Sequence, residues 1–359
     1  MNIGLINTYS YDNIGDAAIY AALSNMLAEH SLFSTLPHTT RTHNAINFAK
    51  DLNQCTQFIS VGGDIFNNTR PHFITRQFLS NLQQLKKAPK STFSFGQSIP
   101  ASCHGLALKL LTHQLKKLAS VTVRDQQSYQ LLTQQDVNCT LSYDSAFILD
   151  CSQQAQKTAA ELLNQLHANR SALISLREFN ALYPVDNAHF ARNMVILCRQ
   201  LRLRDYQPVL LIQSNVSALD SDLVLAKEIQ QHCPQVKILD VRAHSTATLP
   251  AWELLQALLK VTHLIVAVRY HTAVLALAAG RVPFNLFYSN KGADLSLRLG
   301  IPGCHVEHFR LAELSAYIEH TGSQKFSAQS IKATVKRDFY ANLKQAESYG
   351  GPYEYAQFS

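Results

Sequence analysis

Cationic side chains recur at regular positions in the second half of the sequence. Arg177, Arg242, Arg269 and Lys291 each follow a short apolar run, and His271 stands two residues after Arg269. A guanidinium can bind a carboxylate or phosphate through two parallel hydrogen bonds, and lysine and histidine add positive charge. For any one of these residues, an ordinary ion pair is the simpler explanation. Their shared relation to the apolar runs predicts a site for an anionic ligand.

Small and polar residues follow the apolar runs of the first half. They are Asn13, Gly15 and Asp16 after the first run, Gly62, Gly63 and Asp64 after the second, Gln97 after the third and Arg124 after the fourth. Glycine lets backbone N–H groups come close to a ligand. Asp16 precedes a helical pattern, so it either caps that helix or acts as a base. We therefore expect a second set of ligand-binding loops here.

Several other chemistries have no sequence support. The chain has no GxxxxGK[ST] loop, no GxGxxG after its first apolar run, no HExxH and no GxSxG. These absences argue against a P-loop hydrolase, a dinucleotide enzyme, a zinc protease and a serine hydrolase. The 15 histidines show no metal-ligand spacing, and the seven cysteines form no CxxC pair. We therefore expect no metal site and no catalytic thiol.

Strands and helices alternate along the whole chain. The apolar runs predict strands at 3–7, 57–61, 91–96, 121–124, 172–176, 208–213, 237–241, 263–268 and 283–287. Amphipathic patterns predict helices at 17–30, 78–87, 106–118, 152–168, 249–259, 272–279 and 328–348. This alternation is typical of βαβ units and mainly parallel sheets.

The pattern predicts an α/β protein of two Rossmann-like domains that face each other across a cleft. We expect the domains at 1–150 and 151–325, and a helical tail at 326–359 that folds back on the first domain. Open parallel sheets bind ligands at the carboxyl ends of their strands. The cations and small polar residues described above follow such ends, so the predicted site lies between the domains.

Composition favours a soluble protein. Hydrophobic residues make up 47% of the 359 residues, charged residues make up 16%, and the formal net charge is +7. The basic residues are spread out, so no nucleic-acid-binding arm is indicated. The longest apolar stretch, 263–280, is interrupted by Arg269, Tyr270 and His271, which argues against a transmembrane helix. The first residues do not resemble a signal peptide. We expect a cytoplasmic protein with reduced thiols.

The motifs in chain order resemble the polysaccharide pyruvyltransferase family. Between residues 3 and 292 they are Asn13-Ile14-Gly15-Asp16, Gly62-Gly63-Asp64, Gly96-Gln97-Ser98-Ile99-Pro100, Arg124-Asp125, Asp144-Ser145-Ala146-Phe147, Arg269-Tyr270-His271 and Tyr288-Ser289-Asn290-Lys291-Gly292. The family usually has glycine where Asp64 stands, proline where Ser145 stands and leucine where Tyr270 stands. The resemblance implies a fold similar to the B-type glycosyltransferases. It also implies transfer of pyruvate from phosphoenolpyruvate to a sugar as a ketal.

The resemblance links Arg124, His271 and Lys291 to phosphoenolpyruvate, and Arg269 lies in the same motif as His271. It places the donor on the second domain and the acceptor on the first. The predicted substrate-binding residues are Arg124, Arg269, Lys291, Arg177, Asn13, Gly15, Gly62, Gly63 and Gln97. His271 either contacts the phosphate as a cation or acts as the general acid, and Asp16 is the candidate base. The scheme needs no metal or organic cofactor.

Two other functions stay open at this stage. A nucleotide-sugar glycosyltransferase would also need cations beside a pyrophosphate, and a non-catalytic relative would bind an anion without turnover. The acceptor is a sugar or glycan whose identity and linkage the sequence does not give. A lipid-linked acceptor would bring this basic protein to the inner membrane surface.

Overall fold

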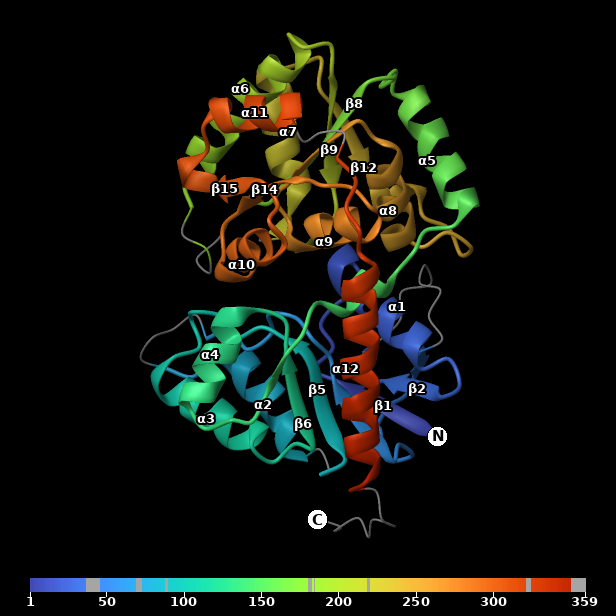
Figure 1. The fold of residues 1–359 in the computed structure, drawn as a ribbon, viewed down its shortest axis with the longest axis vertical. Coiled ribbons are helices and arrows are strands. Elements are labelled where there is room, and N and C mark those ends of the chain that lie inside the picture. Colours follow the sequence, from blue (N-terminus) through green and yellow to red (C-terminus); the bar gives the residue numbers. More distant parts are fainter. Residues whose placement is uncertain are drawn as a thin grey trace.

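A computed structural model describes residues 1–36, 46–68, 73–87, 90–179, 183, 185–217, 220–320 and 324–349. The last residues of the predicted tail, 350–359, lie outside the described residues. The chain forms two lobes, one above the other, each built on its own sheet (Figure 1). The prediction of two parallel α/β domains is confirmed.

The first sheet has seven parallel strands within the described residues. In spatial order they are β3 (Ile46–Phe48), β2 (Ser31–Ser34), β1 (Asn2–Ile6), β4 (Gln57–Ser60), β5 (Thr92–Gln97), β6 (Ser120–Val123) and β7 (Thr140–Leu141). The segments that accompany them are α1 (Ile14–Met26), α2 (Arg76–Lys87), α3 (Gly105–Leu115), α4 (Gln126–Gln134) and the 3₁₀ turn η1 (Ser145–Ile148).

The second sheet repeats this plan with six parallel strands, again counted over the described ranges. Their order is β12 (Lys237–Asp240), β9 (Gln207–Ile212), β8 (Ser171–Ser175), β13 (Leu264–Ala267), β14 (Phe284–Phe287) and β15 (Gly303–His305). Its helices are α5 (Gln153–Gln165), α6 (Asn187–Arg202), α7 (Asp222–His232), α8 (Ala251–Val261), α9 (Tyr270–Ala278), α10 (Asn290–Leu299) and α11 (Leu311–His320). A short hairpin, β10 (Asn215–Ser217) and β11 (Asp220–Ser221), follows β9, and the 3₁₀ turns η2 (Val241–His244) and η3 (Val306–His308) follow β12 and β15.

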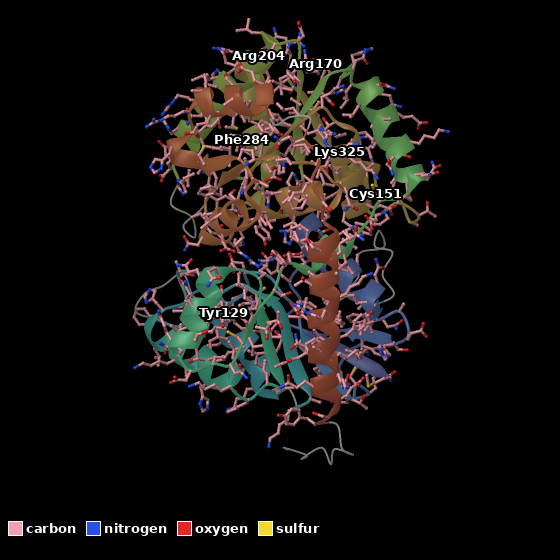
Figure 2. The ribbon with its side chains drawn as sticks, viewed as in Figure 1. Tyr129, Cys151, Arg170, Arg204, Phe284 and Lys325 are labelled. Atoms are coloured by element: carbon pink, nitrogen blue, oxygen red, sulfur yellow. The ribbon has the colours of Figure 1, made fainter. Side chains whose placement is uncertain are left out.

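Both sheets have the Rossmann order, in which the first strand lies in the middle and the chain winds outward in two directions. Helices cover both faces, so the central strands are buried throughout; all six residues of β5 are buried. Phe284 of β14, labelled in Figure 2, lies inside the second domain, where its ring contacts Phe309 and Tyr317. Each domain therefore holds its strand ends on a rigid scaffold.

The two domains are docked at their strand ends. One hydrophobic cluster crosses the junction and includes Ile14 of α1 and Leu254 of α8. The backbone N–H of Ile14 donates to the carbonyl of Gln213, 3.3 Å away. Arg298 of α10 donates to the carbonyls of Arg124 and Ser142, each at 3.0 Å. These contacts fix the cleft that lies between the sheets.

The last helix, α12 (Gln329–Glu347), runs from the second lobe along the first (Figure 1, red). Phe339 packs edge-on against Phe93 and Phe95 of β5, with ring centroids 5.6 and 5.2 Å apart. Tyr340 donates a hydrogen bond to the carbonyl of Met26. Helix α12 thus covers one face of the first sheet.

The predicted elements differ from the structure mainly at their ends. Helix α1 begins at Ile14, three residues before the predicted start, because the side chain of Asn13 accepts a hydrogen bond from Gly15 N and caps the helix. Strands β2, β3, β7 and β15 were not predicted. Each has only two to four residues, too few to show a periodic pattern. Among the described residues, no helix combines the length and apolar character needed to cross a bilayer.

Candidate active site

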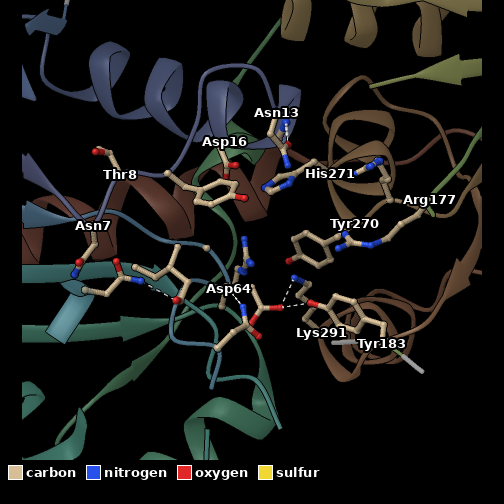
Figure 3. Close-up of a pocket in the computed structure, with 18 of the residues that line it drawn as sticks. Asn7, Thr8, Asn13, Asp16, Asp64, Arg177, Tyr183, Tyr270, His271 and Lys291 are labelled. Atoms are coloured by element: carbon tan, nitrogen blue, oxygen red, sulfur yellow. Dashed lines mark hydrogen bonds and ion pairs between the residues drawn. The ribbon is translucent and has the colours of Figure 1, made fainter. Parts of the chain in front are cut away.

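A cavity of about 390 Å³ lies between the two domains, where the carboxyl ends of both sheets meet. Figure 3 shows its lining side chains. The second domain contributes cationic and aromatic groups, among them Arg177, Tyr270 and His271. The first domain contributes mostly amides and hydroxyls, among them Asn7 and Thr8. We call the cationic and aromatic groups, together with Arg124 of the first domain, the charged wall, and the amides and hydroxyls of the first domain the neutral wall; Asp16 and Asp64 also line the first domain's side.

Three residues that are predicted to bind the donor substrate lie near a single aromatic ring. The guanidinium carbon of Arg124 lies 4.7 Å from the ring centroid of Tyr270, and Nζ of Lys291 lies 5.7 Å from it. The imidazole of His271 meets the same ring edge-on at 5.4 Å. The electron-rich face of an aromatic ring attracts cations. Tyr270 thus helps to hold like charges near one another although they come from distant parts of the chain.

Asp144 joins two of these groups. Its carboxylate forms a buried ion pair with Arg124, and Oδ2 lies 3.4 Å from Nε2 of His271. Burial alone would raise the pKa of Asp144, but the positive charges of His271 and Arg124 outweigh it and hold the pKa well below its usual value. Asp144 is therefore ionised and orients Arg124 and His271 together. Asp144 belongs to one of the family motifs, but sequence reasoning assigned it no role.

The start of α1 is shaped by His271. A methyl group at Gly15 would overlap the imidazole ring, so only glycine lets this helix approach. The predicted contact of Gly15 with a ligand stays a prediction; its observed neighbour is His271. Asn13 caps the helix, and Asp16 in its first turn lines the cavity. Asp16 is thus not the cap, which leaves its predicted role as a base open.

His271 lies in the first turn of α9, and Lys291 lies in the first turn of α10. Free N–H groups and the positive end of the helix dipole attract anions there. Burial lowers the pKa of His271, and the charges of Arg124 and Lys291 lower it further, whereas Asp144 opposes them. The pKa of the His271 imidazole therefore lies below its ordinary value.

Lys291 pairs with an acid from the opposite domain. Its Nζ lies 2.8 Å from Oδ2 of Asp64, and the hydroxyl of Tyr183 donates to the same oxygen at 2.7 Å. Burial would raise the pKa of Asp64, but Lys291 lowers it through its charge and its hydrogen bond, with a further hydrogen bond from Tyr183. Figure 3 shows dashed lines that join Asp64 to both of these side chains.

Arg269 and Arg177 have different surroundings. The guanidinium of Arg269 contacts both carboxylate oxygens of Asp222, which is fully buried, and Nε also donates to the carbonyl of Leu176 at 3.1 Å. The guanidinium carbon of Arg177 lies over the neighbouring rings of Tyr183 and Tyr288, 4.7 and 4.9 Å from their centroids. Both arginines line the cavity. A direct contact of either with a donor stays a prediction.

The loop that contains Gly62 and Gly63 is supported by residues at the end of β5. The side-chain amide of Gln97 donates to the carbonyls of Gly63 and Ser98, at 2.8 and 2.9 Å. A methyl group at Gly62 would collide with the carbonyl oxygens of Phe95 and Gly96. Only Gly63 of these three predicted residues lines the described cavity. The structure therefore explains Gly62 and Gln97 by loop support, and their substrate contacts stay predictions.

Sequence reasoning missed several lining residues. Gln213 at the end of β9 accepts a hydrogen bond from Thr272, while its amide nitrogen is buried without a partner among the described residues. The neutral wall also includes Asn67, Thr75 and Asn81. Gln213 and Asn7 each directly follow a strand, which was the available signal. Neutral amides, however, do not stand out as a row of cations does.

The fold is similar to that of several solved structures, all at low identity. HepE from Anabaena, in complex with UDP and glucose, has a TM-score of 0.58 and 11% identity, covering 96% of this chain and 99% of that one. UDP-GlcNAc 2-epimerase from Methanocaldococcus jannaschii has a TM-score of 0.55 and 11% identity, covering 95% and 100%. Trehalose 6-phosphate synthase from Burkholderia multivorans has a TM-score of 0.57 and 9% identity, covering 97% of each. The predicted likeness to B-type glycosyltransferases is thus confirmed for the fold.

A search of curated protein sequences found no match. The family model of polysaccharide pyruvyl transferase, in contrast, matches residues 13–290. This range contains Asn13, Arg124, His271 and most of both sheets. The match covers well over half of the 359 residues, and the chain therefore belongs to the polysaccharide pyruvyl transferase family.

Proposed function

We propose that this protein transfers pyruvate from phosphoenolpyruvate to two hydroxyls of a sugar, in a cell-surface polysaccharide or its precursor, and releases phosphate. One observation carries the proposal beyond family membership. Arg124, His271 and Lys291, which come from three separate segments, surround the ring of Tyr270 in the interdomain cavity. Phosphoenolpyruvate carries a carboxylate and a phosphate, so it needs several fixed cations.

The charged wall would bind the donor. Arg124 and Lys291 hold its anionic groups, while Asp144 keeps Arg124 and His271 in place. Arg269, paired with Asp222, fixes the start of α9 and also lines this wall. Arg177 completes this wall beside Tyr288. The donor phosphate lies near the first turns of α9 and α10, where the backbone N–H groups also attract it.

The chemistry follows from the donor. A proton added at C3 creates a positive centre at C2, which one sugar hydroxyl attacks. A second hydroxyl then closes the ketal as the C2–O bond to phosphate breaks. One hydroxyl proton balances the proton given to C3, and the other leaves with phosphate. A bound dianion raises the pKa of His271, so the imidazolium either holds the phosphate or donates to C3. Asp16 accepts a hydroxyl proton.

The neutral wall would bind the acceptor. Asn7, Asn67 and Asn81 supply amides, and Thr8 and Thr75 supply hydroxyls. Such groups form hydrogen bonds with uncharged sugar hydroxyls and would leave the strong cations to the donor. The acceptor sugar would be free, nucleotide-linked or lipid-linked, and in the last case the protein would work at the inner face of the membrane. The protein itself would be cytoplasmic.

The test is phosphate release from phosphoenolpyruvate with a panel of glycan acceptors. We expect acceptor-dependent release by the wild type and a loss of about 10²–10⁴-fold in His271→Ala and Lys291→Ala. The exposed residues His113 and Lys336 supply matched controls, since His113→Ala and Lys336→Ala should keep wild-type rates. A melting temperature raised by a nucleoside diphosphate but not by phosphoenolpyruvate would refute the proposal and indicate a glycosyltransferase.

A further inference from the structure

Two cavities share one wall. A second cavity of about 260 Å³ adjoins the first, and Asp64, Tyr183 and Lys291 line both. We call these three residues the cleft bridge. Lys291 comes from the second domain and Asp64 from the first, 227 residues apart. The cleft bridge therefore ties the domains together in the middle of the proposed active site.

The bridge uses the cation that the donor needs. Nζ of Lys291 lies 2.8 Å from Asp64, whose other oxygen, Oδ1, is buried without a partner among the described residues. The side chains of Lys291 and Asp64 are only 11% and 14% exposed, so solvent weakens their attraction little. A phosphoenolpyruvate anion can pair fully with Lys291 only if the ammonium leaves Asp64, so the existing pair competes with the donor.

We infer that Asp64 pairs with the Lys291 ammonium where the donor anion would otherwise pair with it. Asp64 is then a positioning residue, and its competition with the donor sets the affinity for phosphoenolpyruvate. This inference rests on the proposed function. In the donor-free protein, Asp64 and Tyr183 hold the ammonium at the centre of the cleft. When phosphoenolpyruvate binds, Lys291 turns to its anionic groups and the carboxylate loses its counter-ion.

The expected change in phosphoenolpyruvate affinity follows from the strength of the charged hydrogen bond between Asp64 and Lys291. Hydrogen bonds to charged groups are stronger than neutral ones, so losing this competitor should tighten phosphoenolpyruvate binding on the order of tenfold in Asp64→Asn. Tyr183→Phe removes a hydrogen bond that would still stabilise the Asp64 carboxylate after Lys291 leaves it, so this variant should show no gain in affinity. Asp64→Glu keeps the negative charge and should leave the affinity close to that of the wild type.

Calorimetry with phosphoenolpyruvate tests this on the full chain. The set is wild type, Asp64→Asn, Asp64→Glu, Lys291→Met and the double variant Asp64→Asn/Lys291→Met. The gain from Asp64→Asn should vanish in the Lys291→Met background, because that background has no ammonium for which Asp64 and the donor compete. A purely structural effect of Asp64 on binding would persist there. Glu307→Gln is the charge control, since Glu307 lines the second cavity but pairs with His305.

The outcomes separate the two proposals. Tighter binding by Asp64→Asn that depends on Lys291 supports the inference, even if the wild type binds too weakly to measure. Unchanged or weaker binding by a folded Asp64→Asn overturns it, as does an equal gain in the Lys291→Met background or in Glu307→Gln. If neither wild type nor Asp64→Asn binds phosphoenolpyruvate, the proposed function fails and this inference fails with it.

Discussion

Arg269 and Lys291 both follow strands of the second sheet and both line the cavity, yet their partners differ. Arg269 pairs with Asp222, a fully buried acid of the same domain, and Nε and Nη2 both contact the carboxylate. Lys291 pairs through one ammonium with Asp64 of the other domain. The first pair is closed within one domain, whereas the second exists only while the domains are docked.

This difference separates two uses of a strand-end cation. A bidentate pair inside one domain fixes the backbone around it, because either partner left alone would be a buried charge. A single contact across a cleft can be exchanged for a ligand when the ligand offers a better anion. Position at a strand end is the same in both cases, so the location of the partner is what distinguishes support from binding.

The largest expected effect is on stability and concerns the pair of Arg269 and Asp222. Asp222→Asn leaves Arg269 buried without a full counter-charge, so we expect the free energy of unfolding to fall by roughly 3–5 kcal/mol. Urea titration measures it. The double change Asp222→Leu/Arg269→Met should be less damaging than the single change, because it removes both charges. If Asp222→Asn is as stable as the wild type, the distinction between the pairs does not hold.

The pair of Lys291 and Asp64, which joins the two domains, should contribute less to stability than the pair of Arg269 and Asp222, and more to donor binding. In Lys291→Met, Asp64 keeps the hydrogen bond from Tyr183, so we expect a loss of roughly 1.5–3 kcal/mol. Phosphoenolpyruvate affinity should fall by at least about tenfold in the same variant. Urea titration and calorimetry on one preparation give both values. A larger stability loss than in Asp222→Asn would reverse the comparison.

Gly15→Ala tests how far the site depends on the position of His271, which packs against the start of α1. The new methyl group would overlap His271, so either the ring or α1 must shift, at a cost of about 1–3 kcal/mol. Turnover should fall because His271 no longer meets Tyr270 and Asp144 together. Asp12→Ala, at an exposed position nearby, is the control for thermal unfolding and phosphate release. Full activity in Gly15→Ala would show that the ring position is not required.

The smallest effect is a pH dependence of donor binding. The pKa of His271 is lowered in the empty cavity, mainly by burial, and a bound dianion raises it. Between these two pKa values, binding takes up a proton, so affinity should rise as pH falls, by at most about tenfold per unit. Calorimetry in two buffers of different ionisation enthalpy measures the uptake. Unchanged uptake in His271→Gln would assign the proton to another group.

Much of the scaffold was predictable because its signals are local. Long buried strands such as β5 and β9 appear as apolar runs, and the residues that follow them reach the cleft by the geometry of parallel sheets. Short edge strands such as β3 have no such run. The start of α1 was missed because Asn13, not Asp16, is the cap. A cap depends on the local path of the chain, which residue type alone does not fix.

The sequence by itself determined two parallel α/β domains, a row of cations at strand ends, and the family to which these motifs belong. Only the tertiary structure decided which carboxylate each cation meets. Asp144 lies 127 residues from His271, and Asp64 lies 227 residues from Lys291. Pairing over such separations depends on how the domains dock, and that is set by the apolar junction around Ile14 and Leu254 rather than by the charges themselves.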